Sequence, residues 1–340
     1  MQEVRATLPV HPVDLEPFRL GGGGERAAVA AAIDAACCDS GFLLVSGHGV
    51  STPLCDAVLG GFGGFFDLPL AEKRHFVVAD ESANRGYSEL GKEGLAYSRG
   101  EETPPDLFEA FNVGREDAIG PEYDRHREFY APNVWPDHPA GLPATWLEYE
   151  RALRGVADDL LRAMAIALEL HELWLVDRLE RAILTTRAIN YERAPGAPDP
   201  RPGQARMGAH TDYGVLTILL ADDVPGLQVF RAGRWHDVDT PRGSFLCNLG
   251  DMLERWTNNR WTSTLHRVIP PPPDQAGPVR RRSVARFLDC PPDLVVECIP
   301  TCASPDNPAR YEPVSAGAWL REKVLSSRGR RQPDLGEAIV

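Results

Sequence analysis

From Ala182 onward the chain consists of short apolar runs separated by glycine and proline turns. Runs of this length, with turn residues at close intervals, are typical of the strands of a β-sandwich or β-barrel. The chain has 340 residues, which would allow two domains, but a single large β-structure with helices packed on it also fits. The second half of the chain therefore predicts a β-scaffold around which the rest is arranged.

Helical and extended segments are mixed in the first half of the chain. Alanine-rich or amphipathic runs predict helices, and short apolar runs predict strands. The expected helices are 25–38, 53–66, 70–76 and 145–170, and the expected strands are 8–15, 42–45 and 108–113. The irregular, polar stretch between these elements, from residue 76 to 123, is long for a compact protein, and such stretches often belong to binding regions.

The segment 207–214 contains a histidine and an aspartate two residues apart, His210 and Asp212. Side chains alternate faces along a strand, so both point the same way. His266, from a separate β-rich run, would add a second imidazole on the same side of a metal ion, which completes the ligand set of non-haem Fe(II) oxygenases. That set leaves coordination positions open for substrate chemistry. The alternative interpretation is a hydrogen-bonded polar cluster without a metal.

A hairpin is expected immediately after His266. A β-rich run leads into the proline-rich turn 270–278, and a second run returns at 279–288. Pairing the two runs would bring Arg281 and Ser283 within about 5 to 10 Å of His266. A guanidinium beside a hydroxyl at that distance from a metal suits a carboxylate, which it binds through paired hydrogen bonds.

The alternation of strand side chains divides the returning run between two faces. The face toward the metal ligands carries Arg281, Ser283, Ala285 and Phe287. The opposite face carries three arginines, which water is expected to solvate: Arg280, Arg282 and Arg286.

Composition argues against several classes of partner. The formal net charge of -13 disfavours duplex nucleic acid and an anionic membrane surface. No apolar run approaches the length of a bilayer-spanning helix. The seven cysteines are scattered, which suits free thiols in a reducing cytoplasm. We therefore expect a cytoplasmic protein, a monomer or weak homodimer, that acts on a small molecule.

Motifs in a fixed order extend over most of the chain. The second half contains H-T-D-Y-G at 210–214, G-D-M-L-E-R-W-T-N-N-R-W-T-S-T-L-H-R-V at 250–268 and R-R-S at 281–283. The first half contains D-S-G-F-L-L-V-S-G-H-G-V at 39–50, F-F-D-L-P-L-A-E-K at 65–73, R-G-Y at 85–87 and N-V-W-P at 133–136. Together they resemble the 2-oxoglutarate and Fe(II)-dependent oxygenase superfamily, in its isopenicillin N synthase-like branch. The resemblance covers roughly residues 8–322.

The resemblance implies an α+β, mainly β, fold with a single catalytic domain. Its core would be a double-stranded β-helix, or jelly roll, at residues 181–300, which holds both the metal site and the oxoacid site. Residues 1–130 would form the mixed N-terminal region of the oxygenase fold, and residues 131–180 the covering helices. Residues 301–340 would form a C-terminal segment and tail.

The resemblance also assigns roles to residues that match the family's motifs. The three metal ligands named above would bind Fe(II). Arg281 and Ser283 would hold the C5 carboxylate of 2-oxoglutarate, and Asn190 and Tyr191 would approach the same molecule. Glu192 departs from the family's pattern, because plant relatives often have a second tyrosine at that position.

The substrate pocket is less well defined by the resemblance. Six residues are candidates for lining it by analogy: Arg85, Tyr87, Tyr97, Arg99, Phe108 and Phe111. These residues do not identify the substrate. A small organic acid, an amino acid derivative and a product of specialised metabolism all remain open.

The implied reaction consumes dioxygen and 2-oxoglutarate at Fe(II), with ascorbate as a candidate reductant. It releases succinate and carbon dioxide and oxidises the substrate, by hydroxylation in the default case and by desaturation or ring closure as variants. Three other functions remain open at this point. An isopenicillin N synthase-like oxidase would use Fe(II) and dioxygen without the oxoacid. A zinc hydrolase would use the same ligand types, and a ligand-binding jelly roll would have no turnover.

Overall fold

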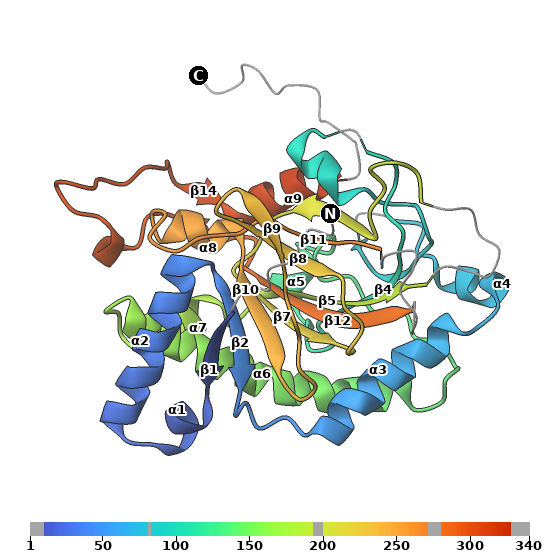
Figure 1. The fold of residues 1–340 in the computed structure, drawn as a ribbon, viewed down its shortest axis with the longest axis horizontal. Helices are drawn as coiled ribbons and strands as arrows, with labels where there is room; N and C mark the ends of the chain where they lie inside the picture. The colour runs from blue at the N-terminus through green and yellow to red at the C-terminus, as the bar shows by residue number, and fades with distance from the viewer. Residues whose placement is uncertain (1–9, 81–82, 102, 193–199, 271–279, 328–340) are drawn as a thin grey trace, which may run out of the picture.

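The computed structural model describes residues 10–80, 83–101, 103–192, 200–270 and 280–327 (Figure 1). Its strands are β1 (His11–Asp14), β2 (Phe42–Ser46), β3 (Gly86–Ser88), β4 (Glu109–Gly114), β5 (Ile183–Tyr191), β6 (Met207–His210), β7 (Leu216–Ala221), β8 (Leu227–Arg231), β9 (Arg234–Asp237), β10 (Phe245–Leu249), β11 (His266–Val268), β12 (Arg281–Asp289), β13 (Val295–Val296) and β14 (Val314–Ser315). Its α-helices are α1 (Glu16–Leu20), α2 (Gly23–Asp39), α3 (Thr52–Phe66), α4 (Leu70–Lys73), α5 (Pro121–Asp124), α6 (Leu142–Ala167), α7 (Trp174–Arg178), α8 (Asp251–Trp256) and α9 (Ala316–Ser327). Short 3-10 helices are η1 (Arg74–Phe76), η3 (Leu95–Arg99) and η4 (Pro300–Cys302).

Two sheets carry most of the strands. The larger has the order β1-β2-β10-β7-β12-β5-β4-β3, and the smaller has the order β6-β11-β8-β9. Figure 1 shows α3 and α6 on one side of the larger sheet, and β8, β9 and β11 on the other side. Side chains from both sheets line one cavity. The arrangement confirms the predicted mainly β fold with a jelly-roll core and flanking helices.

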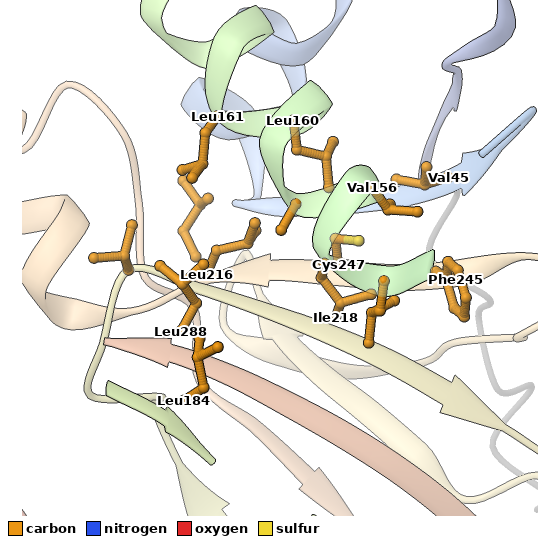
Figure 2. Packing of buried hydrophobic residues seen from close by; sticks show 14 of the residues in the cluster. Val45, Val156, Leu160, Leu161, Leu184, Leu216, Ile218, Phe245, Cys247 and Leu288 are labelled. Atoms are coloured by element: carbon orange, nitrogen blue, oxygen red, sulfur yellow. The ribbon is translucent and has the colours of Figure 1, made fainter. Parts of the chain in front are cut away.

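Helix α6 packs against the larger sheet. Its apolar residues recur every three or four positions, which places them on one side of a helix, and Pro143 suits the first turn. Figure 2 shows Val156, Leu160 and Leu161 among side chains of the sheet such as Ile218. Truncating a fully buried leucine in such a core to alanine costs about 2 to 5 kcal/mol, so this interface contributes much of the fold's stability.

Strand β12 has one face toward the cavity and one toward the helices. Its cavity face carries the alternate residues that begin with Arg281, as the sequence predicts. The prediction that water solvates Arg286 is wrong, because the helices cover that face and leave the side chain 2% exposed. Arg286 instead donates two hydrogen bonds to Glu150 of α6, from Nε to Oε2 at 3.1 Å and from Nη2 to Oε1 at 2.9 Å. Arg280 and Arg282, on the same face, keep 25% and 36% of their side chains exposed.

Replacing Glu150 with alanine is expected to lower the free energy of unfolding by about 3 to 5 kcal/mol, because it leaves the buried guanidinium of Arg286 without its charged partner. Chemical denaturation measures the change. Glu148, an exposed acid of the same helix, provides the matched control, and its replacement by alanine is expected to change stability by less than about 0.5 kcal/mol. Equal effects of the two substitutions would contradict the importance of this pair.

The expected hairpin between the strands of His266 and Arg281 is not formed. Strand β11 pairs with β6 and β8 in the smaller sheet, whereas β12 pairs with β5 and β7 in the larger one. The predicted turn at 270–278 lies almost entirely outside the described residues. The two strands contribute side chains to the cavity from different sheets. A pattern of run, turn and run does not distinguish a hairpin from a passage between two facing sheets, which explains the error.

No single helix in the described part of the chain is long and apolar enough to cross a bilayer. The helical pair Thr52–Phe66 and Leu70–Phe76, bent by 106°, meets the criteria of length and composition only when its two members are taken together.

Candidate active site

The structure brings the predicted metal ligands together at the ends of two paired strands. His210 closes β6, His266 opens β11, and the two are Cα partners. Asp212 follows two residues after His210, and its Oδ1 lies 3.7 Å from the Nε2 atom of each histidine. One ligand atom from each of the three residues lies within 4.8 Å of the others. All three side chains are buried, so the cluster has the dimensions and the donor set of a site for one metal ion.

Hydrogen bonds orient both imidazoles. Nδ1 of His210 lies 2.8 Å from the carbonyl oxygen of Gly208, and Nδ1 of His266 lies 3.0 Å from that of Thr264. An Nδ1–H that donates to a carbonyl leaves the Nε2 lone pair directed at the cluster. Burial and the neighbouring His266 lower the pKa of His210 to about 4, so this imidazole is neutral at physiological pH. Both histidines therefore direct Nε2 at the cluster, and His210 is in the neutral state that binds a metal.

The carboxylate of Asp212 is held through its other oxygen. Oδ2 accepts a hydrogen bond from Thr217 Oγ1 at 2.5 Å and another from Asn248 Nδ2 at 2.7 Å. Burial opposes ionisation of this carboxyl, but the two histidines and these hydrogen bonds outweigh it and lower the pKa of Asp212. Oδ1 is left to face the histidines. Sequence reasoning missed both supporting residues, because only the pairing of β7 with β10 brings them to Asp212.

Replacing Thr217 with valine is expected to weaken ferrous iron binding by roughly 10- to 100-fold, because residues that orient a metal ligand typically have effects of this size. Valine has nearly the same shape as threonine but cannot donate to Asp212. Serine at the same position keeps the hydroxyl and is expected to retain most of the affinity. Anaerobic titration with ferrous iron measures both variants, and equal dissociation constants for valine and serine would contradict the role of the hydroxyl.

A buried cation, Arg281, lines the same cavity. Arg281 is 2% exposed and forms no ion pair among the described residues, although its charge acts on the nearby carboxyl of Asp222. Its Nε and the Oγ of Ser283 are buried without a hydrogen-bond partner in the described part of the chain. The guanidinium carbon lies 5.3 Å from the ring centre of Tyr191. A buried guanidinium that forms neither an ion pair nor a hydrogen bond is costly, so this end of the cavity is suited to a ligand that carries an anion.

At this end of the cavity, adjacent residues of β5 point to opposite faces of the strand. Tyr191 lines the cavity, but Asn190 points to the opposite face. There its Nδ2 donates to Glu109 at 2.8 Å and its Oδ1 accepts from Arg280 at 2.8 Å. The expectation that Asn190 contacts the oxoacid is corrected, because adjacent residues of one strand face opposite ways. Glu192 also pairs with Arg280, at 3.3 Å, so its carboxylate is directed away from the cavity lining.

The cavity has a volume of about 340 Å³ and is lined mainly by apolar side chains. Of the six substrate candidates, Arg85 lines the cavity, but the protein's own main chain already accepts most of its hydrogen bonds. Its guanidinium donates to four main-chain carbonyls, those of Ala83, Asn84, Phe129 and Ala131. Burial lowers its pKa to about 10. Arg85 therefore joins two chain segments beside the cavity.

The other five candidates lie outside the cavity lining, which corrects the expectation drawn by analogy with the family. Tyr87 donates to Glu109 at 2.6 Å, and Phe111 packs on Phe65 in the core beneath the sheet. Tyr97 donates to the carbonyl of Thr103 at 2.9 Å. The remaining two are Phe108, which packs against Tyr191, and Arg99, which pairs with Glu101 at 3.5 Å.

The wall of the cavity includes residues that sequence reasoning missed. Helix α9 contributes Leu320, Arg321, Val324 and Leu325. Arg321 pairs with Glu128 at 2.7 Å, and Trp319 donates to the carbonyl of Tyr213 at 3.1 Å, so the helix is fixed to both neighbouring segments. The four-residue spacing of the apolar residues in this helix was a usable signal for a buried face.

Two further charged features belong to the same wall. Arg187 of β5 pairs with Glu93, and both line the cavity. Asp289 lies at the end of β12, where burial and the charge of Asp212 raise its pKa to about 7. Both groups share a strand face with residues named from the sequence, so alternation along β5 and β12 could have indicated them.

A jelly-roll cavity that contains a buried His-Asp-His cluster defines a class, the non-haem metal-dependent oxygenases. Comparison with family models agrees. Residues 10–138 match the model described as non-haem dioxygenase in morphine synthesis N-terminal, and residues 185–289 match that of the 2OG-Fe(II) oxygenase superfamily.

The alignments with individual relatives cover nearly the whole chain. The 2-oxoglutarate-Fe(II) type oxidoreductase hxnY of Emericella nidulans is 32% identical over 329 residues, which cover 94% of this chain and 90% of the relative. Homoarginine-6-hydroxylase 2-ODD-233 of Oryza sativa subsp. japonica is 32% identical over 303 residues, 87% of this chain and 88% of the relative. The structure of full-length Neurospora crassa T7H in complex with alpha-KG matches with a TM-score of 0.81 and 26% identity, over 96% of this chain and 99% of that chain.

The chain therefore belongs to the 2-oxoglutarate and Fe(II)-dependent oxygenase superfamily. It is an oxidoreductase that acts on a small molecule and uses Fe(II) and 2-oxoglutarate. These findings support 2-oxoglutarate-dependent turnover over the oxidase alternative, in which no oxoacid is consumed.

Proposed function

We propose that His210, Asp212 and His266 bind Fe(II), that Arg281 and Ser283 bind the C5 carboxylate of 2-oxoglutarate, and that the protein hydroxylates a small molecule of specialised metabolism. The observation that carries this proposal is the buried, unpaired guanidinium of Arg281 on the same cavity as the three ligands. One diacid would satisfy both features, because one of its ends binds the metal and the other binds the arginine.

The protein's own part in the reaction is positioning and exclusion of water. Iron bound at the three ligands supplies the oxygen-activating chemistry that couples decarboxylation of 2-oxoglutarate to oxidation of the substrate. Thr217 and Asn248 fix the carboxylate ligand. Helix α9 and Phe129 cover the cavity with apolar side chains, which favours a dry site.

The substrate is not transferred from the relatives. The rice relative is named for homoarginine, whereas the name of the Emericella nidulans relative states no substrate. The acidic net charge and the seven free cysteines support a cytoplasmic location and a small-molecule rather than a nucleic-acid or membrane partner. We also propose ascorbate as the reductant between turnovers. The active form is proposed to be a monomer or a weak homodimer.

The test uses the full chain with Fe(II), 2-oxoglutarate and dioxygen. We expect oxygen-dependent formation of succinate, which rises when a productive substrate is added. Anaerobic addition of 2-oxoglutarate to the iron-loaded protein is expected to produce the visible absorption of an iron–oxoacid chelate. Turnover of a substrate without succinate would favour the oxidase. Activity that persists without oxygen, with zinc in place of iron, would favour the hydrolase. Absence of oxygen uptake across candidate substrates would favour the ligand-binding jelly roll.

A further inference from the structure

The residue Asp289 lies on the cavity face of β12 at the end opposite to Arg281. Alternate residues of this strand face the cavity. Phe287 is the Cα partner of Thr217, whose hydroxyl donates to the proposed ligand Asp212. Asp289 is two residues further, or roughly 7 Å along the strand. Along β12, the position of the metal ligands therefore lies between Arg281, where the oxoacid is proposed to bind, and Asp289. Asp289 belongs to the part of the cavity that is left for the substrate.

The carboxyl of Asp289 is buried without a partner. It is 9% exposed, and within the described ranges no hydrogen bond or ion pair reaches its oxygens. Apart from Arg281 at the opposite end, other charged groups of the cavity wall have partners, as in the pairs of Arg187 with Glu93 and of Arg321 with Glu128. A buried polar group without a partner destabilises a fold. Such a group is therefore expected to find its partner in a bound molecule.

Close packing fixes the position of this carboxyl beside the metal ligands. A Cβ built on Gly214 would lie 2.1 Å from Oδ1 of Asp289 and 2.9 Å from the carbonyl oxygen of Leu288. Only glycine allows such a contact without displacing a neighbour. Gly214 is two residues beyond Asp212, so the carboxyl of Asp289 lies against the backbone of the segment that carries a proposed ligand.

Apolar side chains form much of the surroundings of Asp289. Ile183, its Cα partner in β5, belongs to a cluster that includes Leu320 and has Phe129 and Val324 packed against it. All four side chains line the cavity. A ligand at this end therefore meets a largely apolar surface, on which the carboxyl of Asp289 has no partner and that of Glu128 is paired with Arg321.

We infer that Asp289 accepts a hydrogen bond from the substrate, and that the substrate is an amine, a guanidine or a hydroxyl compound with an apolar body rather than a carboxylic acid. The inference deepens the proposed function and rests on it, because it needs the oxoacid at the Arg281 end. An N–H or O–H donor would satisfy the carboxyl of Asp289, whereas a carboxylate substrate offers only acceptors and has no hydrogen to donate to it.

The experiment compares three probes that share one ring: benzylamine, benzyl alcohol and benzoate. Isothermal titration calorimetry measures their binding to the full chain loaded anaerobically with Fe(II) and 2-oxoglutarate. We expect benzylamine or benzyl alcohol to bind about 10- to 100-fold more tightly than benzoate. Asp289→Leu is expected to abolish that preference. Asp289→Asn distinguishes the donors, because its amide oxygen still accepts from the alcohol but no longer attracts the ammonium.

Controls separate the inference from the function on which it rests. Binding of 2-oxoglutarate to the iron-loaded wild-type protein is measured first, and its failure would count against the proposed function alone. Glu128→Gln alters an acid of the same cavity that already pairs with Arg321, and it is expected to leave the ratio between probes unchanged. Thermal unfolding checks that each variant is folded. Benzoate binding as tightly as the donors, an unchanged ratio in both Asp289 variants, or no binding of either donor would overturn the inference.

Discussion

Replacing Asp212 with alanine is expected to abolish tight ferrous iron binding and to reduce succinate formation to background. The substitution removes the one charged ligand of the cluster, whose Oδ1 lies 3.7 Å from both imidazole Nε2 atoms. Only the two imidazoles remain as ligands, and the donors Thr217 and Asn248 lose their acceptor. The loss should exceed the roughly 10- to 100-fold change expected for a residue that only supports a ligand. Anaerobic iron titration and succinate assays measure the two effects.

Asp223 provides a matched control for this substitution. It is an exposed aspartate outside the lining of the cavity, and its replacement by alanine is expected to leave iron affinity unchanged. Circular dichroism checks that the variant of Asp212 keeps its fold, so that lost binding is not attributed to unfolding. Retained iron with full turnover in the folded Asp212→Ala protein would rule out the proposed ligand set.

Local periodicity explains why the sequence indicates the metal cluster so directly. The spacing of His210 and Asp212 depends only on the two-residue repeat of a strand and the turn that follows it. The same repeat places Arg281 and Ser283 on one face of β12. Applied consistently, it would also have separated Asn190 from Tyr191, because neighbours on a strand face opposite ways. The family pattern of adjacent oxoacid contacts therefore does not hold for Asn190, whose side chain binds Glu109 and Arg280 on the other face.

Other features depend on contacts between distant segments, which no local pattern contains. Arg286 is buried because α6 covers its side of the sheet. Strand alternation shows that Arg286 points away from the cavity, but it does not show whether water or a helix lies on that side. The passage of the chain from β11 in one sheet to β12 in the other cannot be distinguished from a hairpin by residue types alone. The role of α9 in the cavity wall likewise depends on where a late helix docks.

Replacing Arg281 with alanine is expected to weaken 2-oxoglutarate binding by about 10- to 100-fold, because a hydrogen bond to a charged group contributes about 1.5 to 3 kcal/mol. Arg281 forms no ion pair among the described residues, and Asp222 acts on it only from a distance, so most of the effect should appear in the affinity for the oxoacid. Lysine at this position is expected to restore the affinity only in part, because its ammonium is a point charge without the planar fork that matches a carboxylate. Titration of the iron-loaded protein with 2-oxoglutarate measures both variants.

The neighbouring residue Arg282 tests whether the effect depends on the face of β12 from which the guanidinium projects. Arg282 carries the same charge one position later, but it points to the opposite side of β12, where it lies 3.7 Å from Asp222. If net charge alone attracted the oxoacid, alanine at either position would weaken binding similarly. If a fixed guanidinium binds one carboxylate, Arg281→Ala should have a large effect and Arg282→Ala a small one, with iron affinity unchanged in both. Equal effects, or an unchanged affinity for the oxoacid in Arg281→Ala, would place the anion-binding group elsewhere in the cavity.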